Sequence, residues 1–369
     1  MGDGQTLTDR GAVIKVLGVG GGGSNAVNRM YKERVPGVEY VVINTDTQHL
    51  SRNDVPTKVA IGQRLTRGLG VGGNPELGRQ AAEESREELA EMVKGADMVF
   101  ITAGMGGGTG TGAAPTIAEL AKENGALTVA VVSKPFVWEV YQRRKNAEDG
   151  ITRLKDKVDT LIGIPNDRLL SLSQQREELY TWEDALKLAD TVLQQGVQTI
   201  AEVVTVPGEI NVDFADVKAV MSEAGPAWMA LGKGRGEHRA IEAARQATKS
   251  PLLDISIEGA RRILFVLTGG TTLTLKEVQE AADAIQEVAD PEANVIFGTV
   301  KDLKMDDEVK ITLIATGFPS QEMLMQQEEG LRRLLRETAS NGDEEDLEVP
   351  TFLRREAARM RRARPGFIQ

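Results

Sequence analysis

Three features of the sequence predict an α/β protein with two domains. Buried strands alternate with helices over the first 165 residues, a long helix with an apolar stripe follows, and a second strand-rich unit comes after it. The strands of the first unit are almost continuously apolar, which is typical of a parallel sheet covered by helices on both faces. The second unit predicts a smaller α+β domain with a mostly antiparallel or mixed sheet.

The first unit contains five expected strands and several helices. The helix over 74–93 has Pro75 near its first turn, where proline is tolerated. Two other helices follow glycine-rich segments, one from about residue 20 and one within 104–121, and a fourth covers 146–158. The expected strands are 12–19, 39–46, 96–103, 126–135 and 159–165.

The long helix is expected over 182–206, and its apolar residues recur at helical spacing. This stripe predicts a core contact and consists of Leu186, Ala189, Val192, Leu193, Val197, Ile200 and Val204. In the second unit we expect strands over 261–270, 293–300 and 308–318, with a helix over 274–290. From Pro319 onward the chain turns polar.

Composition excludes several classes of function. The 369 residues contain no cysteine, so disulfides, thiol nucleophiles and cysteine-ligated zinc are excluded. His49 and His238 are the two histidines, and they suggest no metal cluster. A net charge of −11 argues against nucleic acid as a partner. The N-terminus does not resemble a signal peptide and no apolar stretch approaches membrane-spanning length, so we expect a cytoplasmic protein.

The first glycine-rich segment, "GVGGGGSNA" (18–26), follows a buried strand directly. Gly18, Gly20 and Gly23 fit the pattern G-x-G-x-x-G, and Asp46 ends the second strand 23 residues after Gly23. This arrangement matches the Rossmann dinucleotide fingerprint, in which a helix N-terminus binds the pyrophosphate. Taken alone it favours an NAD-binding oxidoreductase, and a purely structural tight turn is an alternative.

A second segment, "GMGGGTGTG" (104–112), holds six glycines and follows another buried strand. A third, "GLGVGGNPELG" (68–78), precedes the helix between them. Since parallel strands place such connections at one edge of the sheet, several backbone cradles would surround one site, which suits a triphosphate. The P-loop pattern is absent and neither main loop contains lysine, so backbone N–H groups, helix dipoles and a metal ion would neutralise the phosphates.

"GGGTGTG" (106–112) is the signature of the tubulin and FtsZ superfamily of GTPases, and the surrounding residues resemble bacterial FtsZ. The similarity covers roughly residues 11–318, and a short stretch, "LEVPTFLRREA" (347–357), resembles the FtsZ C-terminal recognition peptide. The other motifs that fit in order and spacing are "IKVLGVGGGGSNAVNRM", "NTD", "SKPF", "IPNDRLL", "NVDFADV" and "SPLL".

The resemblance implies a GTP-binding site in the first domain, with Mg²⁺ coordinated mainly through the nucleotide. Asp190 would accept hydrogen bonds from guanine, and Glu139 and Arg143 would contact the ribose and phosphates, although an exposed ion pair four residues apart is an alternative. The residues implied to hold the α- and β-phosphates are Gly21, Gly22, Gly23, Ser24 and Asn25. Those implied around the β- and γ-phosphates are Gly108, Thr109, Gly110, Gly72 and Gly73.

"GEINVDFADVKAVM" (208–221) would be the catalytic loop of the second domain. From its position at the start of a helical pattern, Asp213 is first interpreted as an N-cap. The resemblance implies that Asp213 and Asp216, assisted by Asn211, enter the GTP site of the next subunit and activate water there. A head-to-tail contact of this kind yields filaments. A tubulin-like scaffold that does not hydrolyse GTP is an alternative, against which the retained aspartates argue.

Two segments depart from the family pattern. The stretch 171–186 is longer than usual, with Leu186 in place of an aromatic residue, and Val140 replaces a glycine. The expected organisation is a GTP-binding domain (1–180), a central helix (181–206), an α+β domain (207–318), a linker (319–346) and a recognition peptide with a basic tail (347–369). Cell-division adaptor and membrane-anchor proteins are the partners implied for the peptide, and the division site is the implied location.

Overall fold

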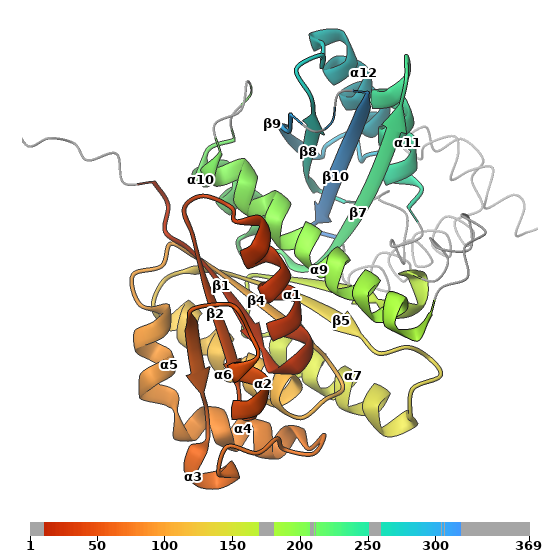
Figure 1. Cartoon of the computed structure of the whole chain (residues 1–369). Helices are drawn as coiled ribbons and strands as arrows, with labels where there is room; N and C mark the ends of the chain where they lie inside the picture. Colours follow the sequence, from red (N-terminus) through yellow and green to blue (C-terminus); the bar gives the residue numbers. More distant parts are fainter. Residues whose placement is uncertain are drawn as a thin grey trace, which may run out of the picture. The chain divides into compact units, whose positions relative to one another are not determined.

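The computed structural model describes residues 11–169, 181–206, 210, 212–250, 260–303, 305 and 307–318. The described residues up to Phe318 form one compact unit. Its centre is a ten-stranded sheet in the order β3-β2-β1-β4-β5-β6-β7-β10-β8-β9 (Figure 1). The strands are β1 (Ile14–Val19), β2 (Val38–Asn44), β3 (Thr57–Ala60), β4 (Met98–Gly104), β5 (Leu127–Lys134), β6 (Thr160–Pro165), β7 (Gly225–Arg235), β8 (Arg262–Gly269), β9 (Asn294–Lys301) and β10 (Glu308–Thr316).

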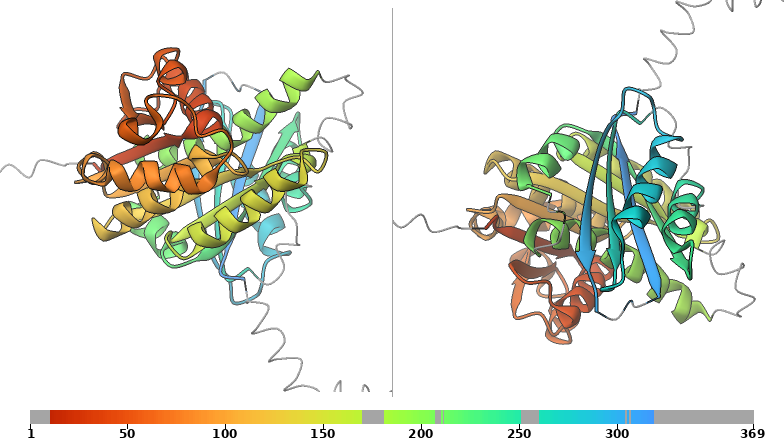
Figure 2. Two further views of the ribbon diagram at one scale, coloured as in Figure 1. Left: turned by 90° about the horizontal axis from the view of Figure 1, so that it is seen from below. Right: turned by 90° about the horizontal axis from the view of Figure 1, so that it is seen from above.

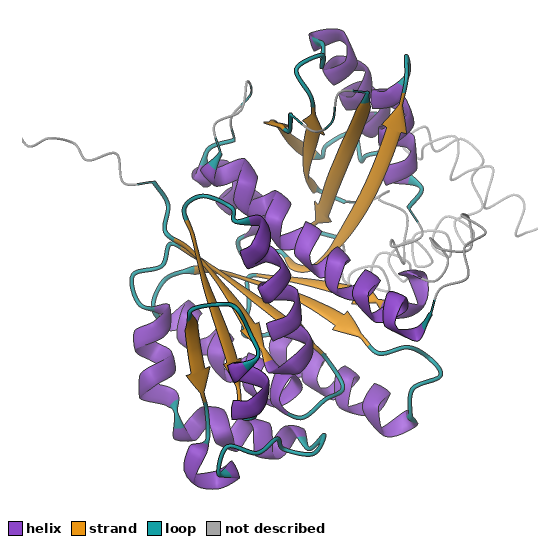
Figure 3. Cartoon of the chain, in the orientation of Figure 1, coloured by secondary structure: helices purple, strands orange, loops and turns teal. Residues whose placement is uncertain are grey.

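The longer helices lie along the faces of this sheet (Figure 3). They are α1 (Gly20–Glu33), α2 (Thr47–Ser51), α3 (Gln63–Thr66), α4 (Pro75–Glu84), α5 (Arg86–Val93), α6 (Thr109–Glu123), α7 (Tyr141–Lys155), α9 (Trp182–Thr205), α10 (Phe214–Met221), α11 (Arg239–Thr248) and α12 (Leu275–Gln286).

The first six strands of the sheet are parallel, as the apolar sequences of five of them predict. The edge strand β3 was not expected from the sequence. Ile14 of β1 lies beside Val38 on one side and Met98 on the other. One face is covered by α1 and α9, and the other by α4, α5, α6 and α7 (Figure 2). With both faces buried, the strand ends are the exposed parts of the sheet, and a ligand can reach the sheet there.

The second half of the sheet is mixed. β7 and β8 both pair antiparallel with β10, and β9 is parallel to β8. α11 and α12 cover one face of these strands (Figure 2). β6 and β7 join the two halves through the parallel pairing of Thr160–Ile162 with Gly225–Ala227.

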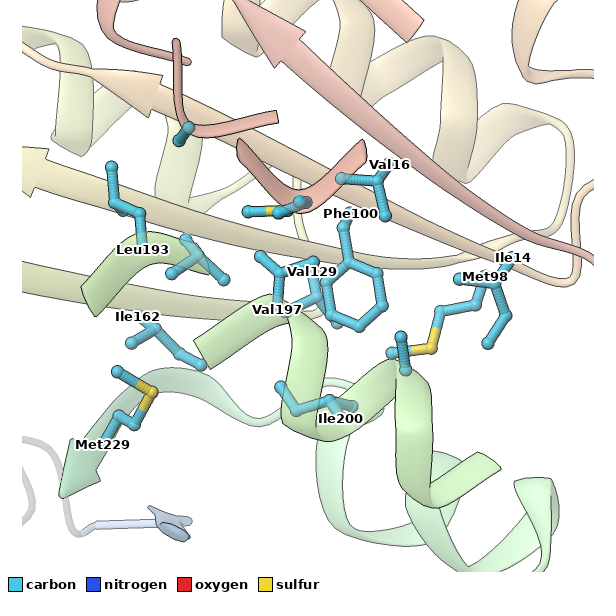
Figure 4. Packing of buried hydrophobic residues seen from close by; sticks show 14 of the residues in the cluster. Ile14, Val16, Met98, Phe100, Val129, Ile162, Leu193, Val197, Ile200 and Met229 are labelled. Atoms are coloured by element: carbon cyan, nitrogen blue, oxygen red, sulfur yellow. The ribbon is translucent and has the colours of Figure 1, made fainter. Parts of the chain in front are cut away.

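α9 packs between the two halves and belongs to the largest apolar cluster (Figure 4). Thr181 and Asp184 form a capping box at its start, which satisfies two N-terminal N–H groups. The predicted stripe is confirmed over the described side chains: Ala189, Val192, Leu193, Val197 and Ile200 are buried, and Val204 packs against the cluster. Burial of each of the larger side chains stabilises the fold by about 1.5–3 kcal/mol. The side chain of Leu186 lies outside the described residues.

Several predicted elements differ from those observed. The helix expected over 74–93 is two helices that meet at Ser85, and the helix expected from residue 146 begins at Tyr141. β7 and α11 were not expected from the sequence. In the case of β7, its glycines oppose a strand assignment. A Cβ added at Gly232 would lie 1.9 Å from the carbonyl oxygen of Ala243, so the glycine permits close packing of α11 on the strand.

Candidate functional site

A cavity of about 370 Å³ lies at the carboxyl edge of the parallel strands. β4, β5 and β6 reach it with Gly104, Ser133 and Asn166, the last of which directly follows β6. The predicted site residues that line it are Gly21, Gly22, Gly72, Gly73, Gly108, Thr109, Gly110, Glu139, Arg143 and Asp190. Residues from three glycine-rich segments and from α9 therefore meet around one cavity.

The first segment supplies the N-terminus of α1. The helix begins at Gly20, so the glycines form its first turn and not a preceding loop. This turn has no side-chain N-cap and no acidic residue. Its backbone N–H groups are therefore available to an anion, and the helix dipole favours negative charge there.

Three residues of this segment do not line the cavity. Gly23 is buried, and an added Cβ would lie 2.1 Å from the carbonyl oxygen of Thr102. Ser24 is also buried, and its hydroxyl donates to the carbonyl of Gly18 at 3.4 Å. Asn25 is exposed. Gly23 thus permits α1 to pack on β4, while nucleotide contacts of Ser24 and Asn25 stay predictions.

The second segment supplies the N-terminus of α6, which begins at Thr109. This turn also lacks a side-chain cap and an acidic residue. A Cβ added at Gly107 would meet no atom within 4 Å, so this residue borders open space. The hydroxyl groups of Thr109 and Thr45 lie 2.9 Å apart, which ties the segment to the end of β2.

Other glycines nearby serve packing. A Cβ added at Gly112 would lie 2.0 Å from the carbonyl oxygen of Pro75, and one added at Gly78 would lie 2.4 Å from that of Gly108. α4 and α6 therefore approach each other at backbone distance. The dense glycine run combines two roles, an anion cradle at its start and a helix contact further on.

The third segment places Gly72 and Gly73 on the cavity wall with φ values of 58° and 78°. No atom lies within 4 Å of a Cβ added at either residue. The side-chain amide of Asn146 donates to the carbonyl of Gly73 at 3.3 Å, which holds the segment against α7. Positive φ explains why glycine occupies both positions.

Glu139 and Arg143 line the cavity and also pair with each other, with 2.6 Å between Glu139 Oε2 and Arg143 Nη1. Glu139 Oε1 accepts a hydrogen bond from the backbone N–H of Phe136 at 2.9 Å. The two interpretations of these residues are therefore compatible: Glu139 and Arg143 form an ion pair at the start of α7, and both also line the cavity.

Asp190 lies on α9 at the cavity, and its side chain is 16% exposed. Its Oδ2 is 3.4 Å from Nη2 of Arg29 on α1. Burial raises the pKa of Asp190 to about 6, and the guanidinium of Arg29 opposes this rise. A largely buried carboxylate in a cavity, with its pKa raised by burial, is a candidate for a functional site.

Sequence reasoning missed Asn166 as a site residue. It is buried, lines the cavity, and its Oδ1 has no hydrogen-bond partner among the described residues. A buried polar atom without a partner costs about 1–3 kcal/mol, so it indicates a ligand contact. The signal in the sequence was its place directly after a buried parallel strand.

Asp213 and Asp216 form a capping box at the start of α10, as the N-cap interpretation predicts. Both are exposed. Asp216 Oδ2 accepts from the N–H of Asp213 at 3.3 Å, and Asp213 Oδ1 accepts from the N–H of Ala215 at 3.4 Å. Asn211 lies outside the described residues.

α10 lies at the amino-terminal edge of the parallel strands, opposite the cavity. The hydroxyl of Thr160, the first residue of β6, donates to the carbonyl of Met221 at the end of α10. α9 runs from the cavity toward the opposite edge of the sheet (Figure 1). At 1.5 Å per residue, its end at Thr205 lies about 22 Å along the helix axis from Asp190. The aspartates of α10 therefore cannot reach the cavity of their own chain.

Uncapped helix N-termini, a largely buried carboxylate and a doubly wound parallel sheet define a nucleotide-binding α/β protein. Residues 13–174 match the model of the GTPase domain of the Tubulin/FtsZ family. Residues 225–319 match the model of the C-terminal domain of the FtsZ family. The chain therefore belongs to the FtsZ family of tubulin-like GTPases.

Solved structures agree with this assignment. An empty FtsZ dimer from M. jannaschii is 46% identical, covers 84% of this chain and 90% of its own, and superimposes with a TM-score of 0.81. A mutant of M. jannaschii FtsZ gives 46% identity, 84% and 92% coverage and a TM-score of 0.80. CetZ2 from Haloferax volcanii, a GTPγS-bound protofilament, is 22% identical over 88% of this chain and 99% of its own, with a TM-score of 0.71, and shares the fold.

The family assignment makes the chain a GTPase and not the NAD-dependent oxidoreductase that the first glycine segment alone favoured. The motif misled because both protein classes bind phosphates at the helix after the first strand. Within the described part of the chain, no helix is both long and apolar enough to span a membrane.

Proposed function

We propose that this GTPase assembles head to tail into filaments and hydrolyses GTP where neighbouring subunits meet. The single observation that carries the proposal is the separation of the cavity from Asp213 and Asp216, which lie at opposite edges of one sheet. An active site that needs both is completed only when α10 of one copy faces the cavity of another. Such a contact is heterologous and does not close, so it propagates into a filament.

The three glycine segments would hold the triphosphate. Gly21 and Gly22 at the start of α1 would bind the α- and β-phosphates through backbone N–H groups, with Gly23, Ser24 and Asn25 completing this segment. Gly108, Thr109 and Gly110 would bind the β- and γ-phosphates. Gly72 and Gly73 would border the γ-phosphate, and Glu139 and Arg143 the ribose and phosphates.

Asp190 would select guanine. Its carboxylate can accept hydrogen bonds from the N1 and N2 donors of guanine, a pair that adenine lacks, and Asn166 offers a further unpartnered acceptor nearby. Asp190→Asn should weaken GTP binding and improve binding of XTP, whose C2 carbonyl accepts from the new amide. Unchanged GTP affinity in the variant would remove Asp190 from the base site.

Mg²⁺ would neutralise charge on the phosphates. No group of three or more His, Asp or Glu side chains converges as a metal site among the described residues. The acidic residues at the cavity, Glu139 and Asp190, each face an arginine. We therefore propose that the ion is coordinated mainly by phosphate oxygens, with the protein contributing hydroxyl groups such as that of Thr109.

In hydrolysis, the carboxylates of Asp213 and Asp216 would orient and activate the attacking water in the neighbouring subunit, assisted by Asn211. Phosphoryl transfer depends mainly on an in-line nucleophile and on neutralised charge at the γ-phosphate. The helix N-termini of one subunit and the aspartates of the next would divide these two tasks between them.

GTPase activity measured against protein concentration tests the proposal. Specific activity should be negligible in dilute protein and rise sharply above a critical concentration, at which filaments begin to pellet. A constant rate per molecule at all concentrations would overturn the shared site. A chain that binds GTP and pellets but never hydrolyses would instead be a scaffold.

A mixture of two inactive variants gives a stricter test. Gly108→Ser damages the phosphate cradle but leaves α10 sound, while Asp216→Asn does the reverse. If the two copolymerise, shown by pelleting of both, the α10 of the first can meet the cavity of the second and restore part of the activity. Copolymers that stay inactive would contradict catalysis between subunits.

We also propose a role in cell division at a cytoplasmic division site. The peptide around Pro350, Phe352 and Leu353 lies outside the described residues, and its resemblance to the FtsZ recognition peptide supports docking onto adaptor and membrane-anchor proteins. Deletion of 347–369 should spare polymerisation and GTP hydrolysis but abolish recruitment to the membrane. A truncated protein that still reaches the division site would contradict this role.

A further inference from the structure

Arg29 and Asp190 form an ion pair between α1 and α9 beside the cavity. Oδ2 of Asp190 lies 3.4 Å from Nη2 of Arg29, and the side chains are 16% and 37% exposed, respectively. Asp190 lines the cavity but Arg29 does not. An effect of Arg29 on a ligand in the cavity would therefore be indirect, through the carboxylate of Asp190.

The charge of Asp190 depends on this neighbour. Burial raises the pKa of Asp190 to about 6, and Arg29 is the charged residue of the described chain that lowers it. No other charged group among the described residues on the surrounding elements shifts the pKa of Asp190. On α9 itself Lys187 is exposed, at the end of β5 the Lys134 side chain lies against Gly163, and across the cavity Glu139 and Arg143 pair with each other.

We propose that Arg29 is a positioning residue for base recognition, which keeps the buried carboxylate of Asp190 ionised and oriented toward the base without touching the nucleotide. This inference rests on the proposed function, in which Asp190 accepts hydrogen bonds from guanine. Each carboxylate oxygen can accept two hydrogen bonds, so Oδ2 can face Arg29 and the base at once. A protonated carboxyl would instead present a donor to the donors of guanine.

This arrangement makes guanine binding dependent on pH. Because the carboxylate form binds and the pKa of Asp190 is about 6, GTP affinity is retained above pH 7 and falls as the pH drops through 6. Removal of the arginine charge would raise the pKa of Asp190 further. The loss of affinity would then begin at a higher pH.

GTP dissociation constants measured between pH 5.5 and 8.5 test the proposal. The variants are Arg29→Met, which removes the charge at similar length, and Arg29→Lys, which keeps it. Lys32→Met is the matched control, because Lys32 lies one turn further along α1 and pairs with the exposed Asp54. The ratio of each variant to the parent chain is taken at each pH, so ionisation of the phosphates cancels.

An opposite charge nearby shifts a carboxyl pKa by about one unit or more, so Arg29→Met should weaken GTP binding roughly fivefold at pH 6 and less than twofold above pH 8. Arg29→Lys and Lys32→Met should stay within about twofold of the parent chain throughout, since both leave a charge beside Asp190. Circular dichroism at pH 6 and pH 8 confirms that the variants are folded.

A ratio for Arg29→Met that does not change with pH, or a tighter binding of GTP by this variant, would overturn the role of Arg29 while the proposed function stands. Absence of GTP binding by the parent chain at pH 7.5 would overturn the proposed function itself and the inference with it. The two failures are thus distinguishable in one set of titrations.

Discussion

At the cavity end of α9, both α1 and α6 begin without side-chain caps, and the side chain of Asp190 is largely buried. Beyond the other end of α9, Asp213 and Asp216 are exposed and cap α10. Among the described residues at the first end, no side chain caps either helix start, and Oδ1 of Asn166 has no hydrogen-bond partner. Polar groups at the second end satisfy each other within the chain. The same kind of feature, a helix N-terminus, is therefore used in opposite ways on the two edges of one sheet.

This difference separates binding from catalysis. Groups without partners lower the stability of the free protein and favour a ligand that satisfies them. The capping box of α10 needs no ligand, because its N–H groups already have hydrogen-bond partners within the chain. Its exposed carboxylates acquire a second role only when another subunit brings a cavity to them.

The largest effect is expected at the α10 end. Asparagine is as good an N-cap as aspartate, so Asp213→Asn should preserve the helix while removing the charge. General acid–base assistance commonly contributes about 100-fold or more, so hydrolysis in filaments of Asp213→Asn or Asp216→Asn should fall by at least that factor. GTPase assays on pelleted filaments, with nucleotide binding measured separately, check this result.

Glu88→Gln, which removes an exposed carboxylate from α5, is the control and should hydrolyse GTP normally. A loss of GTP binding equal to the loss of hydrolysis would show that the two ends are not separate in function.

The next largest effect is expected when a carboxylate, like those at the start of α10, is introduced at an uncapped helix N-terminus of the cavity. Gly107→Asp places a carboxylate beside the uncapped start of α6, where an added Cβ meets no atom within 4 Å. The charge would compete with the phosphates for the helix N-terminus, and GTP binding should weaken by about tenfold to 100-fold. Fluorescence or calorimetric titration measures this loss.

Gly107→Asn, of nearly the same size but without charge, should lose much less affinity. Equal losses in the two variants would show that bulk and not charge is excluded at this position.

A smaller effect, on stability alone, is expected for a glycine that packs helices. Gly112→Ala would place a Cβ 2.0 Å from the carbonyl oxygen of Pro75 and 2.6 Å from the backbone nitrogen of Arg79, so α4 and α6 would have to separate. Such overpacking costs about 1–3 kcal/mol of the free energy of unfolding. Urea denaturation measures it, with Gly107→Ala as the control that should cost less than 1 kcal/mol.

The smallest effect concerns the stability cost of Asp190. The folded pKa of about 6 lies above the ordinary 3.8, so this carboxyl destabilises the fold progressively as the pH rises from about 4 to about 6, and fully above that. The isosteric Asp190→Asn should raise the free energy of unfolding by about 1–2 kcal/mol at pH 7.5 and change it little at pH 4. Urea denaturation without nucleotide at the two pH values measures the difference.

The reverse pH dependence, with a gain at pH 4 and none at pH 7.5, would mean that Arg29 stabilises the carboxylate by more than burial destabilises it. The charge of Asp190 would then be stabilised within the chain, as the charges of Asp213 and Asp216 are by their hydrogen bonds at the start of α10.

The sequence by itself determined five of the six strands in the parallel half of the sheet and the central helix, because apolar strands and a helical stripe are local patterns that burial on both sides requires. It missed the short edge strand β3, of which only Val59 is buried. It also predicted that glycine-rich segments would meet at one edge, since parallel strands leave no other arrangement. Asp213 was correctly interpreted as an N-cap from its position before a helical pattern.

Only the tertiary structure decided which glycines face the cavity and which pack helices. Gly107 and Gly112 stand five residues apart in one run, yet the first borders open space and the second touches the backbone of α4. Likewise, the burial of Asp190, its approach to Arg29 and the opposite placement of α10 arise from segments far apart in the chain. The physical reason is that free space, burial and charge separation depend on packing between elements, which no local pattern of residues specifies.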